Sequence, residues 1–169
     1  MKKIVLSLLL AAGLMAAENS DYVGFTIGNT DYRLDTLGSN GSVDDTHYSL
    51  TLGHYYESSR VSATYSYVDG GDDNFDSNYA FSFAYDFILP LVEDTFSLYA
   101  GPVVGYTRLK DDGINLSGIH YGGQAGAIVE VVENIELEVG YQFTMQTGSD
   151  NGIDADYGKK WYVGANIRF

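Results

Sequence analysis

A histidine and a serine two positions apart are the first residues in this sequence whose types could support nucleophilic chemistry. They are His47 and Ser49, and the other histidines are His54 and His120. An adjacent base can turn a serine hydroxyl into a nucleophile. In a β-strand these two side chains would share one face, opposite Tyr48, because successive side chains alternate. An enzyme is favoured only if His47 or His120 lies close to a serine and a carboxylate at the rim of the fold.

Aspartates gather in four segments, one of which has the spacing of a calcium loop. This segment reads Asp72-x-Asn74-x-Asp76, but it lacks the glycine that should follow and has Phe83 in place of the twelfth-position glutamate. We therefore interpret the acidic segments as solvated surface, with weak divalent-cation binding as the alternative. Zinc-ligand spacing and nucleotide-binding glycine motifs are absent, so we predict no metal site and no cofactor. The four segments hold Asp44-Asp45, Asp69–Asp76, Asp111-Asp112 and Asp150/Asp154/Asp156.

Strict alternation of apolar and polar residues identifies the elements that would position these groups. In IELEVGYQFTMQ, Ile135 to Gln146, every odd position is apolar and every even position is polar or glycine. A period of two residues indicates a β-strand with one apolar and one polar face. Seven other segments show the same pattern, which predicts an all-β protein with eight strands. The predicted strands are Asp21–Tyr32, His47–Tyr56, Arg60–Val68, Asn78–Ile88, Phe96–Arg108, Gly118–Val131, Ile135–Gln146 and Tyr157–Phe169.

The connections between these strands alternate between short and long. Such a pattern predicts an antiparallel up-and-down meander whose two ends differ, as in outer-membrane barrels with short periplasmic turns and long external loops. An even number of strands places both termini on the side of the short turns. The short connections are Glu57–Ser59, Leu89–Thr95 and Val132–Asn134, and the long ones are Arg33–Thr46, Asp69–Ser77, Lys110–Ser117 and Thr147–Asp156.

The composition of the two faces favours a transmembrane β-barrel. The polar face is rich in Gly, Ser, Thr, Ala and Gln, which suit the crowded interior of a narrow barrel. The apolar face carries aromatic residues such as those of Tyr79-Phe81-Phe83-Tyr85, which are typical of a membrane surface. Closure would leave no backbone group unpaired in lipid. The alternative is a soluble eight-stranded barrel of the lipocalin type, with its apolar side inward.

Alternation also assigns seven charged residues to the lumen. Unpaired charges in a narrow, dry space are costly, so these residues should pair with one another. We predict that they form a salt-bridge plug, because eight strands leave an interior just wide enough to be filled by side chains. The alternative is a polar path for ions, as in a small porin-like channel. The predicted charge cluster is Arg60, Asp86, Glu130, Glu136, Glu138, Lys160 and Arg168.

The N-terminal segment has the layout of a secretory signal peptide. Lys2 and Lys3 precede an apolar run from Ile4 to Leu14, which small residues and then polar ones follow. We predict cleavage after Ala17, so that residues 1–17 are the signal peptide and residues 18–169 form one barrel domain. The run is too short for a membrane anchor. Export to an oxidising compartment without any cysteine means that packing, and not disulfides, must stabilise the fold.

The net charge of −14 argues against nucleic-acid binding, which needs a basic face. The ending WYVGANIRF resembles the C-terminal assembly signal of outer-membrane barrels, a terminal aromatic preceded by alternate apolar residues. The residues that match are Trp161, Val163, Ala165, Ile167 and Phe169.

With this ending and the strand pattern, residues 18–169 resemble the OmpA/OmpX-like outer-membrane β-barrel family of Gram-negative bacteria. The resemblance implies a location in the bacterial outer membrane, contact with membrane lipid and lipopolysaccharide, and insertion by the barrel-assembly machinery. Acidic external loops could also engage the divalent ions that bridge lipopolysaccharide. We expect a monomer with a structural or surface-interaction role, in envelope integrity or adhesion, and no enzymatic activity.

Two enzyme classes of similar size are alternatives to that expectation. His47-Tyr48-Ser49 invites comparison with eight-stranded lipid A deacylases, in which a histidine and a serine two residues apart lie on the lipid-facing surface. Here alternation puts both residues in the lumen, which departs from that pattern. A lipid A palmitoyltransferase needs an apolar lumen for an acyl chain, and the lumen predicted here is polar.

Overall fold

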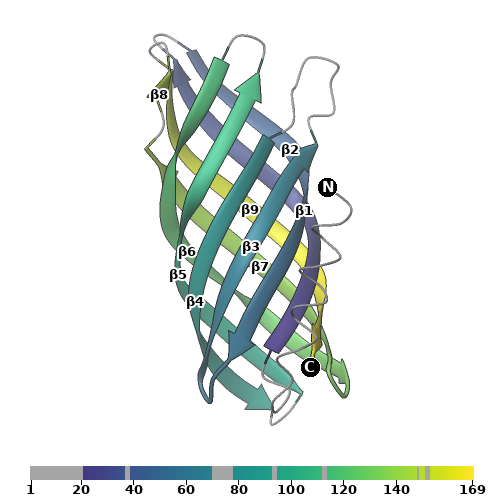
Figure 1. Cartoon of the computed structure of the whole chain (residues 1–169). Helices are drawn as coiled ribbons and strands as arrows, with labels where there is room; N and C mark the ends of the chain where they lie inside the picture. Colours follow the sequence, from purple (N-terminus) through teal and green to yellow (C-terminus); the bar gives the residue numbers. More distant parts are fainter. Residues whose placement is uncertain are drawn as a thin grey trace.

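The computed structural model describes residues 21–36, 39–69, 78–92, 95–111, 114–147, 149–150 and 153–169. These residues form a closed β-barrel of eight long strands (Figure 1). The predicted signal peptide, residues 1–17, lies outside the described residues. The strands are β1 (Asp21–Thr36), β2 (Ser39–Tyr55), β3 (Ser59–Asp69), β4 (Asn78–Val92), β5 (Phe96–Asp111), β6 (Ile114–Val132), β7 (Ile135–Gln146) and β9 (Ile153–Arg168), with a two-residue β8 (Ser149–Asp150).

Each long strand pairs antiparallel with the next one along the chain, and β1 pairs with β9 to close the barrel. Ile27 illustrates the closure, since it lies opposite Tyr48 of β2 and opposite Val163 of β9. Closure pairs the backbone of both terminal strands, which removes the free edges that an open sheet would have. The predicted eight-stranded antiparallel meander is therefore confirmed.

Helices are absent from the described residues. Within the same residues, no helix is long and apolar enough to cross a membrane.

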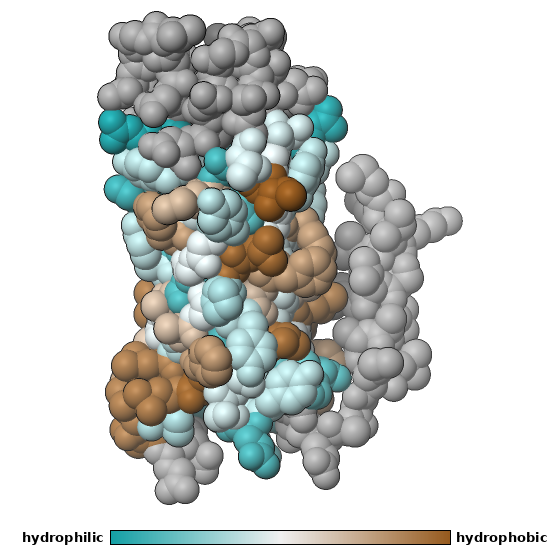
Figure 2. Space-filling model, turned by 90° about the vertical axis from the view of Figure 1, so that its left-hand side faces the viewer, coloured by the Kyte–Doolittle hydropathy of each residue, from teal (hydrophilic) through white to brown (hydrophobic). Residues whose placement is uncertain are grey.

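The barrel has its polar residues inside and its apolar residues outside. In β7, Leu137 and Val139 are 51% and 52% exposed, whereas Glu136 and Glu138 are only 4% and 7% exposed. The apolar face of every alternating segment thus points away from the interior, which contradicts a lipocalin-type barrel with an apolar core. Figure 2 shows apolar side chains over the middle and lower parts of one side, with hydrophilic ones above them.

Large tyrosines opposite glycines fill much of the lumen. The rings of Tyr99 and Tyr162 lie where a side chain at Gly140 would point, and Tyr22 occupies the equivalent place beside Gly53. Glycine is required at these positions because the aromatic rings approach the barrel wall directly. The three tyrosines are almost fully buried, at 2–7% exposure.

Short turns and the first and last residues of the barrel share one end of it (Figure 1). The turn between β6 and β7 contains only Glu133 and Asn134, and Asn134 has φ 69°, a left-handed conformation that asparagine tolerates well.

At the other end, the predicted long connections are partly wrong. β1 continues to Thr36 and β2 begins at Ser39, so most of Arg33–Thr46 is strand. Likewise β6 begins at Ile114 and β9 at Ile153. A hairpin that extends beyond the apolar part of the outer face keeps the backbone hydrogen bonds between its strands. It loses the alternation of apolar and polar residues by which a strand is recognised in the sequence.

Candidate functional site: a charged layer across the lumen

Neighbouring strands β3 and β4 bring the central ion pair of the lumen together. Arg60 stands near the start of β3, in register with Asp86 of β4. Both side chains point inward because they alternate with outward residues such as Tyr85 and Phe87. Glu138 reaches the same point from β7, on the far wall of the barrel.

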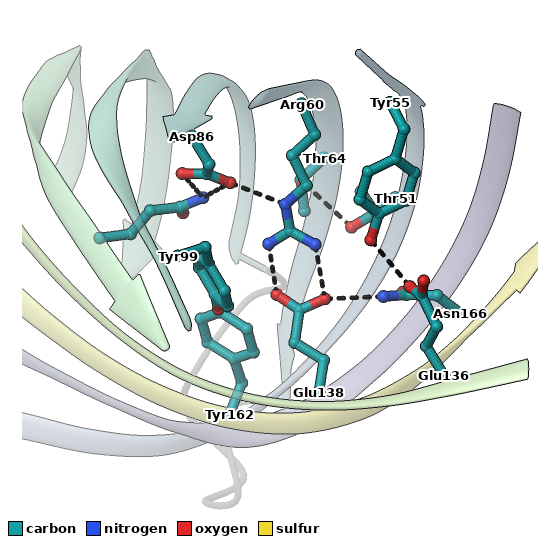
Figure 3. A network of polar contacts seen from close by, with 11 residues as sticks. Thr51, Tyr55, Arg60, Thr64, Asp86, Tyr99, Glu136, Glu138, Tyr162 and Asn166 are labelled. Atoms are coloured by element: carbon teal, nitrogen blue, oxygen red, sulfur yellow. Dashed lines mark hydrogen bonds and ion pairs between the residues drawn. The ribbon is translucent and has the colours of Figure 1, made fainter. Parts of the chain in front are cut away.

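The Arg60 guanidinium joins these two carboxylates across the lumen (Figure 3). Its Nε donates to Asp86 Oδ2 at 2.9 Å, and its Nη1 and Nη2 donate to Glu138 Oε2 and Oε1 at 3.1 and 2.7 Å. The two bonds to Glu138 form the two-point geometry that makes arginine–carboxylate pairs strong and directional. All three residues are buried, so this geometry must offset a large desolvation cost.

Neutral polar groups complete the surroundings of both carboxylates. Gln124 Nε2 donates to both oxygens of Asp86 at 2.9 Å, and Asn166 Nδ2 donates to Glu138 Oε2 at 2.8 Å. The carbon Cζ of Arg60 lies 4.2 Å from the centre of the Tyr99 ring, within the range of a cation–π contact. The charged layer is therefore held from all sides, and we define it as Arg60, Asp86, Glu138, Gln124 and Asn166.

A second ion group lies at the mouth where the short turns are. Arg168 pairs with Glu130 and, through Nε at 3.2 Å, with Glu136 Oε1. Tyr55 Oη donates to Glu136 Oε2 at 2.7 Å. Next to this group is a cavity of about 340 Å³, which Tyr56 also lines. The mouth of the barrel is thus hollow around Arg168, Glu130 and Glu136.

Lys160 stands apart from the other six residues of the predicted charge cluster. Its Nζ donates to Ser49 Oγ at 3.1 Å and to Ser66 Oγ at 2.9 Å. It makes no ion pair with any carboxylate whose side chain the structure describes. The structure therefore groups the seven residues as Arg60 with Asp86 and Glu138, Arg168 with Glu130 and Glu136, and Lys160 alone.

Between side chains that the structure describes, small cavities of about 20 and 30 Å³ lie inside the barrel, and Lys160 and Gln142 line both. Each has room for only one or two water molecules. The smaller lies in the half of the lumen away from the short turns, and the other lies beside Arg60. The lumen is thus largely filled with side chains.

The histidines of the lumen are held by hydroxyl groups. His120 Nε2 lies 3.0 Å from Ser82 Oγ, and its Nδ1 lies 2.7 Å from Thr107 Oγ1. His47 Nδ1 lies 3.0 Å from Thr30 Oγ1. Among the described residues, the hydrogen-bond partners of His120 are thus a serine and a threonine and not a carboxylate.

His47 and Ser49 both point into the lumen, where they are 0% and 2% exposed. Ser49 Oγ contacts Ser66 Oγ at 2.8 Å as well as Lys160. This is a structural hydroxyl network, and the adjoining cavity of about 20 Å³ leaves no room for a substrate. The arrangement that would favour an enzyme is not formed in the described part of the chain.

Metal ligands are likewise not gathered in the described residues, where no group of three or more His, Asp or Glu side chains could hold an ion. The calcium-like segment Asp72-x-Asn74-x-Asp76 lies outside the described residues, so its interpretation as solvated surface, with weak cation binding as the alternative, stays a prediction.

Sequence reasoning missed several residues of the charged layer and its surroundings. Alternation places Gln124 and Tyr162 on the polar face of their segments, but nothing in the sequence singles them out as partners of the ions. Alternation also places Tyr22 and Tyr99 inside, and this signal could have identified them as lumen residues. Tyrosine is, however, also typical of a membrane surface, so its type alone does not indicate a place in the lumen.

Comparison with solved structures identifies this architecture. Neisserial surface protein A is 15% identical over 91% of this chain and 99% of that chain, with a TM-score of 0.73. Outer membrane protein H (OprH) from P. aeruginosa is 22% identical over 89% of this chain and 99% of that chain, with a TM-score of 0.66. The chain has the fold of the small outer-membrane β-barrels. The resemblance seen in the sequence is thus confirmed at the level of the fold.

The outer membrane enzyme PagL shares the fold as well, with 16% identity over 88% of this chain and 99% of that chain and a TM-score of 0.59. A barrel of this kind therefore does not by itself define an activity. Neither protein-family models nor curated proteins match the chain.

Proposed function

We propose that this barrel is an integral protein of the bacterial outer membrane with a structural and surface-interaction role. The observation that carries the proposal is the polarity of the barrel, which is the reverse of that of a water-soluble protein. Ion pairs lie inside the barrel, and large apolar side chains are exposed on its outside. An exposed apolar surface of this extent is unfavourable in water and favourable in lipid.

The height of the apolar surface supports membrane insertion. On β4, seven alternate outward residues from Tyr79 to Leu91 are aromatic or leucine. They span about 40 Å along the strand, or about 30 Å across the membrane for a strand tilted by about 40°. Phe83, Phe87 and Leu91 are 54%, 63% and 53% exposed. This height matches the hydrocarbon core of a bilayer.

The filled lumen favours a rigid scaffold over a channel. The charged layer and the tyrosines fill the barrel above the mouth, and the small cavities left inside it have room for only one or two water molecules each. In this role the barrel presents acidic segments at the external end for contact with other molecules, with the short turns and both termini in the periplasm. A small channel is the alternative function, and it requires the charged layer to open.

The C-terminal strand fits recognition by the assembly machinery during insertion. Trp161, Val163 and Ile167 are exposed on the outer face, at 53%, 43% and 52%. They share this face with Ala165, in the alternation that the assembly signal requires.

The proposal is tested by fractionating cells that express the full chain and by refolding the protein into phosphatidylcholine vesicles. We expect it in the outer-membrane fraction, and we expect the folded barrel to migrate differently on a gel before and after boiling. Recovery in the soluble fraction, or a helical circular-dichroism spectrum, would overturn the proposal.

A further inference from the structure

The cavity of about 340 Å³ beside Arg168 is much larger than the cavities of about 20 and 30 Å³ inside the lumen. We call it the mouth cavity. It lies at the end of the barrel where the short turns are, and the proposed scaffold role gives it no task. Sites for small molecules have volumes of about 300–1,000 Å³. The mouth cavity is therefore large enough to hold a small organic molecule.

One wall of the mouth cavity is apolar, although the lumen of this barrel is mostly polar. It is formed by Ile88 and Pro90 of β4 and Ile128 of β6. The register brings these residues together, because Ser97 of β5 lies opposite Pro90 on one side and opposite Ile128 on the other. Ile88 and Pro90 continue the inward face on which Asp86 stands. A ligand that fills the cavity therefore needs an apolar part to cover this wall.

The adjoining wall, on β6, β7 and β9, carries two carboxylates that share one arginine. Arg168 pairs with both Glu130 and Glu136, so this group has one excess negative charge. Both oxygens of Glu136 are engaged, Oε1 by Arg168 and Oε2 by Tyr55 Oη at 2.7 Å (Figure 3). Glu130 contacts Arg168 through Oε2, and the described residues offer no hydrogen bond to its Oε1. Glu130 can therefore accept a hydrogen bond from a ligand.

The charge of the mouth cavity is negative even when its rim is included. Glu57 lines the cavity from the turn between β2 and β3, where it is exposed. Among the described residues that line the cavity, three carboxylates and one guanidinium give a net charge of −2. Arg60 adds no free positive charge nearby, since it is already paired with Asp86 and Glu138. This balance favours a cation as the ligand.

Aromatic rings stand beside these carboxylates. Tyr55 and Tyr56 both line the mouth cavity, and Tyr56 is 56% exposed. The face of a tyrosine ring attracts cations, and its edge and face also pack against other aromatic rings. The cavity thus offers separate surfaces to a positive group and to an apolar group of the same molecule.

We propose that the mouth cavity binds a small organic cation, in which a primary ammonium group is attached to an apolar or aromatic body. The ammonium group donates a charge-assisted hydrogen bond to Glu130 Oε1, and the body packs on Ile88, Pro90 and Ile128. This inference goes beyond the proposed function. Only the periplasmic location of the site depends on the proposed membrane insertion, because the cavity is formed within the barrel itself.

Isothermal titration calorimetry of the full chain in detergent tests the inference, with titration into detergent alone as the blank. The probes are phenethylammonium, its neutral analogue phenethyl alcohol, and ethylammonium, which keeps the charge but lacks the ring. We expect phenethylammonium to bind at least about tenfold more tightly than either analogue, since each analogue lacks one of the two interactions. Equal binding of phenethyl alcohol would contradict the role of the carboxylates. Equal binding of ethylammonium would contradict the role of the apolar wall.

Three variants test the residues of the site. Glu130→Gln should bind phenethylammonium about tenfold more weakly, because the charge that assists the hydrogen bond is lost. Glu57→Gln should weaken binding about threefold, since the Glu57 carboxylate is exposed to solvent. Glu57 lies in a turn, so this variant tests the charge of the cavity even if Glu130→Gln does not fold. Ser97→Leu should abolish binding, because the larger side chain extends into the cavity.

Glu133→Gln is the matched control. Glu133 is an exposed carboxylate at the same end of the barrel, in the turn between β6 and β7, but it does not line the mouth cavity. Its affinity for phenethylammonium should equal that of the unmodified chain. Unchanged affinities of both Glu130→Gln and Glu57→Gln would overturn the inference. A loss in Glu133→Gln as large as that in Glu130→Gln would also overturn it, because the effect would then come from the overall charge of this end.

The gel shift of the unmodified chain in phosphatidylcholine vesicles reports on the membrane location separately. A barrel that inserts there but binds phenethylammonium no better than the two analogues would refute the cation site and leave the proposed function intact.

Discussion

Arg60 and Glu138, which are 78 positions apart in the chain, form a two-point ion pair across the lumen at 3.1 and 2.7 Å. The pair joins β3 to β7, two strands that are not neighbours in the sheet. It therefore braces the barrel across its interior, in addition to the backbone ladders around its wall.

Glu138→Gln should destabilise the barrel strongly, because it leaves the Arg60 charge buried with only Asp86 as a charged partner. Breaking a buried pair in this way lowers the free energy of unfolding by about 3 kcal/mol or more. Urea unfolding in detergent, followed by the fluorescence of Trp161, measures the change. Glu133→Gln, in the exposed turn between β6 and β7, is the control and should shift stability by less than about 0.5 kcal/mol. A small effect of Glu138→Gln would show that the pair does not brace the barrel.

Arg60→Ala should convert a closed lumen into a conducting one. Removal of the guanidinium takes away the group that joins both walls and leaves Asp86 and Glu138 to repel each other and attract water. In planar bilayers we expect no discrete current steps for the unmodified chain and cation-selective steps for Arg60→Ala. Arg108→Ala, a change outside the lumen, is the control and should stay closed. Steps of equal size in the unmodified chain would instead favour the channel function.

Gly140→Val should prevent or weaken folding, because the new side chain would collide with the hydroxyl ends of Tyr99 and Tyr162. Overpacking of this kind costs about 1–3 kcal/mol. Gly123→Val is the matched control, since Gly123 is exposed and a Cβ there would meet ordinary contacts only. The yield of heat-shifted barrel on a gel compares the two. Equal yields would contradict the packing of tyrosines against the glycine wall.

A charge on the outer face should be costly at mid-membrane and tolerated near the external rim. Val139→Arg, near the middle of the apolar face of β7, should destabilise the barrel by about 2–4 kcal/mol, whereas Met145→Arg at the external end of the same strand should cost about 0–1 kcal/mol. Both residues are outward and about equally exposed, at 52% and 50%. Urea unfolding in lipid vesicles measures both values. Equal costs would mean that the two positions do not differ in depth.

Alternation in the sequence predicted the strands and their faces well, because the two faces of a segment such as Ile135–Gln146 differ in every residue. It failed at Thr36 and Ser39, where β1 and β2 continue as a polar hairpin whose two faces are chemically alike. Alternation also could not say which charges meet. The contact of Arg60 with Glu138 depends on closure of the sheet and on the height of each strand in the barrel, and neither is encoded in the pattern of one segment. For the same reason, alternation predicts Lys160 in one cluster with the carboxylates, whereas its side chain contacts Ser49 and Ser66.

Quenching of Trp161 by brominated lipids tests the central claim, that the apolar outer face lies in a membrane, most directly. Trp161 is the only tryptophan of the chain and is 53% exposed on the outer face of β9. In vesicles we predict strong quenching, which should be greater with bromines near the headgroup than near the end of the acyl chain, because Trp161 is only two residues from the charged Lys159 on β9. Absence of lipid quenching, together with full quenching by aqueous acrylamide, would place this face in water and contradict the account.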